Sequence, residues 1–415
     1  MEHRKKIWYI SHYVTPPKFD THARAIKFSQ YLKDEGFDVT IIGSSFLHNK
    51  NIHLITDKRK YVKRKYGEIQ FIHIKTKSYH KNGLRRIYSL LQFSMRIYFL
   101  RNEFEKPDYI IHTAQIPFEN FMYFVAKKMK AKYIIEVLDL WPESFVAYGL
   151  IHKKNPLLHL FYQTEKWLYK KADKIIFSME GGKDYVIEKK WDKNNGGPID
   201  LNKVHHVNNG VDLEEFENNI SQYKIDDPDL IMKDSFKVIY IGSIRLANNL
   251  KQLIDAAALL KDYSNIKFLI YGDGGEREKL ENFCKVNNLN NVLFKQKWIE
   301  LKYVPYVLSK SSLNILNYKK NDVLRYGGSQ GKLFQYIASG KPLCSNLKMG
   351  YCLIDKYNIG ISEKFESSKQ YADAILRIAE LNKDDYNKIK NNAKKVARQY
   401  DFKVLTRKLV TILNT

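Results

Sequence analysis

A glycine-rich segment with one lysine, RYGGSQGKLFQYIASGKP (325–342), has the residue types that bind phosphate groups. It does not fit the ATPase loop G-x-x-x-x-G-K-[ST], because Tyr326 stands at the first required glycine and Leu333 follows Lys332. Glycines let backbone N–H groups approach an anion, and KLFQYIAS has the pattern of an amphipathic helix, whose N-terminus attracts negative charge. Lys332, in the first turn, adds a full charge. The segment predicts an anion-binding loop, with an ordinary glycine-rich loop as the alternative.

A second candidate for phosphate binding is YIGSIRLANNL (240–250), which follows an expected strand. It puts Gly242, Ser243 and Arg245 at a strand-to-helix loop, where an arginine can grip a diphosphate with two N–H groups. Together with Lys332, Arg245 would neutralise a leaving nucleotide; the alternative is a solvated loop arginine. A third loop of the same type, YGDGGE (271–276), is weaker evidence by itself.

Two carboxylates and one histidine are the candidates for acid–base chemistry. Asp139 and Glu143 lie in DLWPES, just after an expected strand, where they can hold hydroxyl groups or receive a proton. Either of them can instead cap the following helix, since Pro142 suits an early helical position. His12 ends the first expected strand and faces an acceptor or is a structural histidine.

The composition indicates a globular protein with an anionic partner. The chain has 415 residues, 44% of them hydrophobic, and three cysteines without metal-ligand spacing, which favours a reducing cytoplasm. No segment has the length and apolarity of a signal peptide or a membrane span. The net charge is +25, and residues 50–101 hold 14 Lys or Arg against two acidic residues. A phosphorylated substrate, a membrane surface and nucleic acid are the candidate partners, and a generally lysine-rich composition is the alternative.

Short β-branched and aromatic runs alternate with helical patterns along the chain, as in parallel sheets covered by helices. The strands expected in a first domain are 6–11, 38–44, 69–75, 108–113, 133–139, 174–179 and 203–210, and those expected in a second are 236–243, 266–274, 291–296, 312–317 and 341–346. The fold class is therefore α/β, with two Rossmann-like domains facing a cleft. We expect domain boundaries at 1–207 and 208–396, with a C-terminal helix at 397–415 that packs back on the first domain.

Four motifs, in this order and spacing, resemble family 4 of the retaining glycosyltransferases, which have the two-domain GT-B fold: VHHVNNGVDLEEF, YIGSIRLANN, YGDGGEREKL and KLFQYIASGKP. The N-terminal half resembles the branch that builds bacterial capsule and O-antigen polysaccharides, through HYVTPP with Arg24 in the following helix, SSFLHNKN (44–51) and EVLDLWPES (136–144). The resemblance covers nearly the whole chain. It implies transfer of a hexose or N-acetylhexosamine from a nucleotide sugar, usually a UDP-sugar, without an obligatory metal or other cofactor.

The resemblance also implies roles for individual residues. The implied donor-binding residues are Gly242, Ser243, Arg245, Gly272, Asp273, Lys297, Trp298, Gly327, Gly328, Ser329, Lys332 and Gln335. Arg245 and Lys332 would contact the diphosphate and, with Asp139 and Glu143, count as catalytic. The implied acceptor-binding residues are His12, Asp139 and Glu143. Most relatives carry a carboxylate for the donor ribose where this chain has Gln335, which weakens that hydrogen bond, and an arginine where it has Leu138.

The segment LRRIYSLLQFSMRIYFLR (84–101) predicts a helix that is a candidate for contact with a membrane surface. Its polar residues form one stripe on an otherwise apolar helix: Arg85, Ser89, Gln92 and Arg96. With the basic residues at 58–65, this helix would lie on an anionic membrane surface, or alternatively be buried against the first sheet with Arg85 and Arg96 exposed.

The sequence therefore predicts a cytoplasmic glycosyltransferase, peripheral at the inner face of the cell membrane, that acts on a lipid-linked saccharide. A sugar-nucleotide epimerase or hydrolase of the same fold is the alternative within this class. A polyanion-binding protein is the alternative from another class, but the chain has no recognisable nucleic-acid-binding motif.

Overall fold

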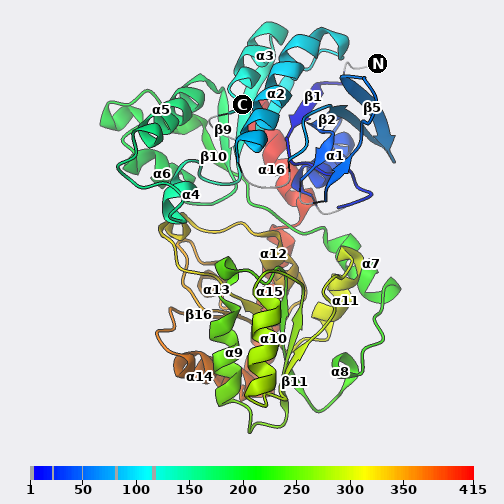
Figure 1. The fold of residues 1–415 in the computed structure, drawn as a ribbon, viewed down its shortest axis with the longest axis vertical. Coiled ribbons are helices and arrows are strands. Elements are labelled where there is room, and N and C mark those ends of the chain that lie inside the picture. The colour runs from blue at the N-terminus through cyan, green and yellow to red at the C-terminus, as the bar shows by residue number, and fades with distance from the viewer. Residues whose placement is uncertain (1–3, 21–22, 49, 80–82, 115–117) are drawn as a thin grey trace. The chain divides into compact units, whose positions relative to one another are not determined.

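The computed structural model describes residues 4–20, 23–48, 50–79, 83–114 and 118–415, so Asn49 of the SSFLHNKN motif lies outside them. Every strand expected from the sequence is present, together with four others at 46–47, 52–53, 61–66 and 360–362. The chain forms two compact units, one of residues 1–208 with 405–415 and one of residues 209–404. The architecture is α/β with two mostly parallel sheets, one in each unit (Figure 1). Within the described residues, no helix is long and apolar enough to cross a membrane.

The N-terminal unit holds an eight-stranded sheet of order β10-β9-β8-β7-β1-β2-β6-β5. Its strands are β1 (Lys6–Ile10), β2 (Asp38–Ser44), β5 (Tyr61–Tyr66), β6 (Ile69–Ile74), β7 (Tyr109–Thr113), β8 (Lys132–Val137), β9 (Lys174–Phe177) and β10 (Val204–His206). All neighbours are parallel except β5, which is antiparallel to β6 at the edge. A separate short pair consists of β3 (Phe46–Leu47) and β4 (Ile52–His53).

Seven helices among the described residues belong to this unit. They are α1 (Arg24–Asp34), α2 (Leu84–Leu100), α3 (Phe121–Met129), α4 (Glu143–Ala147), α5 (Pro156–Lys171), α6 (Gly182–Glu188) and α16 (Phe402–Asn414), with 3-10 turns at 101–103, 193–195 and 201–203. The helix expected over 397–415 is α16, and from Leu405 onward it is part of this unit. Its end is held by two lysines, because Lys5 Nζ donates to Asn414 Oδ1 (3.3 Å) and Lys174 Nζ to Thr415 Oγ1 (2.9 Å).

A buried carboxylate ties the middle of the first sheet to the end of the unit. Glu136 on β8 accepts hydrogen bonds from the Tyr9 hydroxyl (2.7 Å) and from Thr113, and it forms an ion pair with Arg24 Nε (2.7 Å). The rest of the Arg24 guanidinium donates to the backbone carbonyls of Val207, at 2.8 Å, and of Asn208. The arginine in the helix after the HYVTPP motif therefore fixes the point where the chain leaves the N-terminal unit.

The C-terminal unit holds a six-stranded, entirely parallel sheet of order β13-β12-β11-β14-β15-β16. Its strands are β11 (Phe236–Ile241), β12 (Ile266–Tyr271), β13 (Val292–Phe294), β14 (Leu313–Leu316), β15 (Leu343–Ser345) and β16 (Gly360–Ser362). Its helices are α7 (Leu213–Gln222), α8 (Pro228–Ile231), α9 (Leu250–Leu259), α10 (Arg277–Val286), α11 (Val304–Ser309), α12 (Gly331–Ala338), α13 (Leu353–Lys356), α14 (Ser368–Ala379) and α15 (Lys383–Gln399), with 3-10 turns at 246–248, 301–303 and 322–326.

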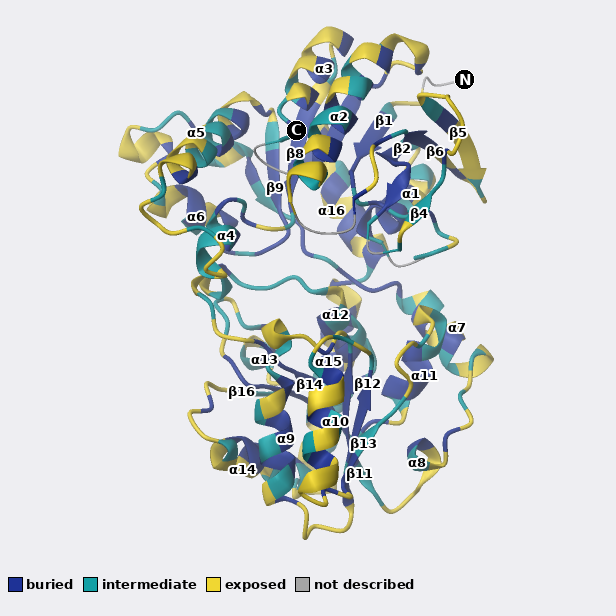
Figure 2. Cartoon of the chain, in the orientation of Figure 1, coloured by how far each residue is buried: buried dark blue, intermediate teal, exposed yellow. Residues whose placement is uncertain are grey.

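Helices cover both faces of this second sheet, so its central strands are almost wholly buried, while residues of the edge strands β13 and β16 are half-buried (Figure 2). Side chains of β11 alternate between two cores, with Ile239 packing on the face of α12 and α15, and Val238 on the face of α9 and α14. This is the pattern that a strand buried on both sides requires. Ligands of such sheets bind at the carboxyl ends of the strands, where the chain reverses between the two faces. Here that point lies between β11 and β14.

Candidate active site

Two glycine loops interlock at the carboxyl ends of β11 and β12. Gly272 has φ +126°, and a Cβ there would lie 1.9 Å from the carbonyl oxygen of Gly242. Gly274 has φ +156°, and its Cβ would lie 2.2 Å from the carbonyl oxygen of Ile244. Backbone hydrogen bonds join the same loops, from Gly242 N to Tyr271 O (3.1 Å) and from Ile244 N to Asp273 O (2.8 Å). These glycines allow a close contact between main chains that any side chain would prevent.

Lys332, in the first turn of α12, lies between two aromatic rings. Its Nζ is 5.1 Å from the centroid of the Tyr240 ring and 5.3 Å from that of Tyr318. The side chain is half-buried, and this burial lowers the pKa of Lys332 to about 8. No carboxylate in the described residues forms an ion pair with it. Buried charges in proteins are paired, so a half-buried cation held only by ring faces is suited to an anionic ligand.

α12 is held to the end of β11 by a tyrosine. The Tyr336 hydroxyl accepts from the backbone N–H of Ile241 (3.0 Å) and donates to its carbonyl oxygen (3.2 Å). The Tyr240 hydroxyl, from the same strand, donates to the carbonyl of Ser243 (2.7 Å). Tyr240 therefore contacts both the lysine of α12 and the loop that leads to Arg245. The two candidate phosphate-binding loops thus meet around one tyrosine.

Arg245 lies three residues beyond Gly242 in this loop, and its side chain is exposed. The structure gives no contact between Arg245 and Lys332, and none between the Arg245 guanidinium and a carboxylate of the described residues. Ser243 accepts a hydrogen bond from the amide of Asn248 through Oγ (2.9 Å). Asp273 is exposed. The Arg245 guanidinium is therefore accessible to an anionic ligand.

The segment that the resemblance assigns to the base follows β13. Lys297 and Trp298 are exposed, the latter by 70%. The carbonyl of the preceding Gln296 accepts from the backbone N–H of Gly272 (3.0 Å), which fixes this segment beside the β12 loop. It therefore adjoins the interlocked glycine loops.

The loop before α12 is fixed by contacts to the start of the unit. Ser329 Oγ accepts from the backbone N–H of Asn209 (2.8 Å), which links the NNGVD motif to the glycine-rich segment. Gly327 has φ +93°, and a Cβ on Gly328 would lie 2.8 Å from the sulfur of Met349. Gln335 is half-buried, one helical turn after Lys332, and its amide makes no hydrogen bond to a described residue. Its carbonyl and amino groups are therefore open to a ligand.

The candidate acceptor residues of the N-terminal unit have three different environments. His12 is buried, its Nε2 lies 3.3 Å from Ser89 Oγ, and its Nδ1 has no partner among the described residues. Burial, and next the charge of Arg86, lower the pKa of His12 to about 3, so the ring is neutral near pH 7. Asp139 is exposed after β8, and no described group bonds its carboxylate. A buried neutral imidazole can hydrogen-bond to a hydroxyl group but cannot attract an anion.

Glu143 differs from Asp139, because its carboxylate is already engaged. Lys189 forms an ion pair with it, and the Tyr162 hydroxyl donates to the same oxygen (2.6 Å). These contacts join α4, α5 and the end of α6. Leu138, where relatives carry arginine, is half-buried. The structure thus gives Glu143 a structural partner, whereas Asp139 is open to a substrate.

The polar residues expected to form one stripe on α2 are mostly not exposed, and the exposure expected for Arg96 if the helix packs on the first sheet is wrong. Ser89 is buried beside His12, Gln92 Oε1 accepts from the backbone N–H of Lys77 (2.8 Å), and Arg96 donates to the carbonyl of Lys75. Only Arg85 of the four is exposed. Gln92 and Arg96 satisfy backbone groups of the segment after β6, and Ser89 contacts the side chain of His12. Helical spacing alone does not reveal such partners.

The tyrosines of the site were not predicted. Tyr240 and Tyr318 flank the lysine and Tyr336 anchors its helix. All three are buried, so in the sequence they have the pattern of ordinary core residues. A tyrosine two residues before a strand-end glycine, as in YIGS, is the signal that identifies Tyr240. Within the described parts of the chain, no three His, Cys, Asp or Glu side chains are grouped as metal ligands.

Comparison with known proteins supports the assignment of the C-terminal unit. Residues 221–396 match the family model described as Glycosyl transferases group 1. A protein of Bacillus subtilis (strain 168) named "Putative glycosyltransferase EpsD" is 32% identical over 118 residues, which are 28% of this chain and 29% of that protein. The alignment thus spans less than a third of that relative.

Solved structures show the fold. The chain resembles Anabaena Alr3699/HepE in complex with UDP and glucose (TM-score 0.66, 14% identity, 99% of this chain and 100% of that one). It also resembles the E. coli structure described as trehalose-6-phosphate bound with UDP-2-fluoro glucose, with a TM-score of 0.74 and 11% identity over 99% of both chains. A third similar structure is WaaG, a glycosyltransferase involved in lipopolysaccharide biosynthesis, with a TM-score of 0.66 and 14% identity over 98% of this chain and 99% of that one. At these identities they establish the GT-B fold, with two Rossmann-like domains, and nothing of substrate.

Proposed function

We propose that this chain is a retaining glycosyltransferase that moves a hexose or N-acetylhexosamine from a UDP-sugar to a lipid-linked saccharide. The observation that carries the proposal is Lys332, a half-buried cation without a carboxylate partner in the described residues, at the N-terminus of the helix after the glycine-rich loop. The match of residues 221–396 to the glycosyl transferases group 1 supports the same reading.

In the proposed reaction, the bond between the sugar carbon and the diphosphate breaks while the acceptor oxygen bonds to that carbon. The diphosphate leaves from one face of the sugar carbon and the acceptor oxygen attacks that same face, so the configuration of the carbon is retained. The acceptor proton passes to an oxygen of the leaving diphosphate. Lys332, Arg245 and the amides of the glycine loops stabilise the charge that grows on the diphosphate, which is where electrostatic help lowers the barrier. These side chains take the place of an obligatory metal ion.

The acceptor would be held by the N-terminal unit. Asp139, exposed at the end of β8, would bind an acceptor hydroxyl. His12 stays a predicted acceptor residue, although its unpaired Nδ1 has almost no exposed surface. Gln335 would bind the donor ribose through a neutral hydrogen bond, which is weaker than the charged one of relatives. The segment with Lys297 and Trp298 would contact the base.

The proposed site of action is the inner face of the cell membrane, and α2 carries the support. Its four most exposed apolar residues share one stripe, at spacings of four, seven and four: Leu84 (84% exposed), Tyr88 (52%), Met95 (40%) and Phe99 (71%). We call them the α2 stripe. On α3, Phe121 packs near Tyr98 of α2 and is itself 37% exposed. Apolar residues exposed on one line indicate contact with another apolar phase.

Exposed basic residues of the same unit complement an anionic lipid surface. They are Lys58, Arg59, Lys60, Lys63, Arg64 and Lys65, on and before the edge strand β5. A pocket between this strand and the end of α2 is lined by Arg59, Lys60, Lys63 and Leu100. Each such charge near an anionic bilayer contributes about 1 kcal/mol. Apolar insertion and attraction to anionic headgroups thus come from neighbouring elements.

The proposal is tested by mass spectrometry after incubation with a panel of nucleotide sugars, with and without lipid-linked saccharides. We expect release of UDP together with a product one sugar heavier, also in the presence of EDTA. Release of UDP without an acceptor product, at an equal rate with and without acceptor, would instead identify the hydrolase or epimerase alternative. If no nucleotide sugar is consumed, the proposed activity is wrong.

A further inference from the structure

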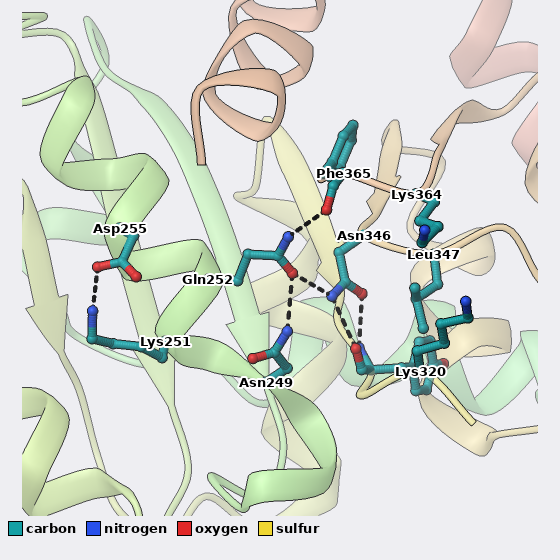
Figure 3. Close-up of a pocket in the computed structure, with 10 residues that line it drawn as sticks. Asn249, Lys251, Gln252, Asp255, Lys320, Asn346, Leu347, Lys364 and Phe365 are labelled. Carbon is teal, nitrogen blue, oxygen red and sulfur yellow. Dashed lines mark hydrogen bonds and ion pairs between the residues drawn. The ribbon is translucent and has the colours of Figure 1, made fainter. Parts of the chain in front are cut away.

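Besides the loops around Lys332, the C-terminal unit has a cavity of about 360 Å³. Neither Lys332 nor Arg245 lines it. It is formed at the carboxyl edge of the sheet by the start of α9 and by the turns after β14, β15 and β16 (Figure 3). The polar residues that line it include Asn249, Gln252, Asn346, Lys251, Lys320 and Lys364. We call it the amide–lysine pocket.

The amides of the pocket are fixed before any ligand arrives. Asn346 is 2% exposed, and its side chain is fully engaged: Oδ1 accepts from the backbone N–H of Tyr318 (2.9 Å), while Nδ2 donates to Gln252 Oε1 (2.9 Å) and Tyr318 O (2.9 Å). Gln252 Nε2 donates to the carbonyl of Phe365 (2.9 Å), and its Oε1 also accepts from Asn249 Nδ2 (3.0 Å). Figure 3 shows this network crossing from α9 to the turns after β15 and β16.

The network leaves polar groups for a ligand. Asn249 Oδ1 accepts no hydrogen bond from a described residue, and the second N–H of Gln252 Nε2 is unused. A fixed acceptor beside a fixed donor suits hydroxyl groups, which offer both functions. Leu347 and Tyr318 add a small apolar wall. The floor of the pocket therefore resembles a surface for a polyhydroxylated molecule.

The rim of the pocket is cationic. Three lysines face one lining carboxylate, Asp255, which pairs with Lys251. Lys320 is exposed and has no ion pair with a described residue, and Lys364 pairs with the exposed Glu366 outside the pocket. Exposed ion pairs contribute about 0–1 kcal/mol, so a ligand can recruit Lys364 at little cost. The rim thus favours a ligand that carries negative charge.

We propose that the amide–lysine pocket binds a monosaccharide-sized anion, a sugar bearing a phosphate or carboxylate, as a ligand separate from the donor. The volume is within the range of small-molecule sites, which begins at about 300 Å³, and exceeds what one inorganic phosphate fills. Tyr318 lies between this pocket and the donor site, since the residue lines the pocket and its ring centroid lies 5.3 Å from Lys332 Nζ. A pocket ligand and a donor diphosphate would therefore occupy two sites on either side of one tyrosine.

Calorimetric titration of the full chain with glucose 6-phosphate, glucuronate and glucose tests the proposal. We expect saturable binding of at least one of the two anions and markedly weaker binding of neutral glucose. Lys320→Gln with Lys364→Gln should weaken the anion by about tenfold or more. Lys319→Gln, a neighbouring exposed lysine that does not line the pocket, is the matched control and should leave the affinity unchanged.

The two sites are distinguished by UDP, whose binding should be unaffected in Lys320→Gln/Lys364→Gln. Loss of anion binding in Lys332→Gln but not in the pocket variant would move the ligand to the donor loop and overturn the proposal. Equal affinity for glucose and the anions, or no saturable binding of any of the three at millimolar concentration, would also overturn it. None of these measurements depends on glycosyl transfer. A failure of the pocket proposal is therefore distinguishable from a failure of the proposed activity.

Discussion

At the scale of single residues, the site depends on a cation in an environment that disfavours it. Burial between Tyr240 and Tyr318 costs Lys332 part of its hydration, which lowers its pKa to about 8. The unfolded chain would hold that proton up to about pH 10.4. Such a group destabilises the ligand-free protein at neutral pH. It attracts an anion, because a negative charge nearby stabilises the protonated lysine.

The titration of Lys332 predicts how UDP binding depends on pH. The diphosphate prefers the protonated lysine, so affinity should fall as the pH rises through about 8. Lys332→Arg stays charged and should lack this decline, and it also controls for ionisation of UDP itself. Calorimetry at pH values on both sides of this pKa measures both profiles. The assignment fails if wild type and Lys332→Arg have parallel profiles.

The same burial predicts that an apolar replacement stabilises the protein. Because the folded pKa is below the unfolded one, the unfolded state binds more protons between about pH 8 and 10.4, and wild-type stability rises across that interval. Lys332→Met removes the cost of burying the charge. It should raise the free energy of unfolding at pH 7 by on the order of 1–3 kcal/mol, allowing for partial solvent screening.

Thermal unfolding of wild type and Lys332→Met at pH 7 and pH 10 measures this effect. The gain in Tm should be clear at pH 7 and small at pH 10, while transfer is lost. A lower Tm for Lys332→Met at pH 7 would mean that the lysine contributes to folding rather than opposing it.

At the scale of elements, the loops after β11 and β12 depend on glycine for their contact. An alanine at Gly272 would need φ +126° and would place its Cβ 1.9 Å from Gly242 O. Gly272→Ala should lower the stability of the C-terminal unit by about 2–4 kcal/mol and weaken UDP binding. Gly275→Ala in the same loop is the matched control, because a Cβ there meets nothing within 4 Å.

Urea unfolding and UDP titration of both variants measure the difference. We expect Gly275→Ala to match wild type in both. If Gly272→Ala were as stable as Gly275→Ala, the loops would have room to separate, and the close contact would not be required.

The α2 stripe makes a prediction about membranes. Leu84→Ser with Phe99→Ser removes the two most exposed apolar side chains of the stripe and should reduce binding to anionic liposomes by about tenfold or more. Val286→Ser on α10, which is 81% exposed in the other unit, is the control and should bind as wild type. Added salt should weaken the wild type, because basic residues supply part of the attraction.

Co-sedimentation with phosphatidylglycerol-containing vesicles at low salt measures this binding. Wild type that stays in solution, or that sediments equally with neutral vesicles, would contradict the role of the stripe and of the basic residues beside it.

At the scale of the whole molecule, the strands and the two sheets could be predicted from the sequence. Alternation of apolar runs and helical patterns is a local signal, and it located each expected strand. Four strands were not expected: β3 and β4, which have two residues each, β5 (YVKRKY), whose exposed residues are lysine and arginine, and β16 (GIS), which begins with a glycine. β5 and β16 are each one of the two edge strands of their sheet.

The candidate site was predictable in its motifs but not in its contacts. Glycine spacing and the first-turn lysine identified the loops. Three features depend on residues far apart in sequence: the tyrosines around Lys332, the ion pair of Glu143 with Lys189, and the inward-facing polar residues of α2 such as Arg96. Spacing within one segment carries no information about such partners. The roles of Arg245, Asp139 and His12 stay predictions.

The central claim is that Lys332 is the partner of the donor diphosphate, and calorimetry of UDP against uridine tests it most directly. The difference between the two ligands isolates the contribution of the diphosphate. In Lys332→Ala, UDP should lose about tenfold or more in affinity while uridine binds as in wild type. If UDP keeps its full advantage over uridine in Lys332→Ala, the diphosphate binds elsewhere and Lys332 is not its partner.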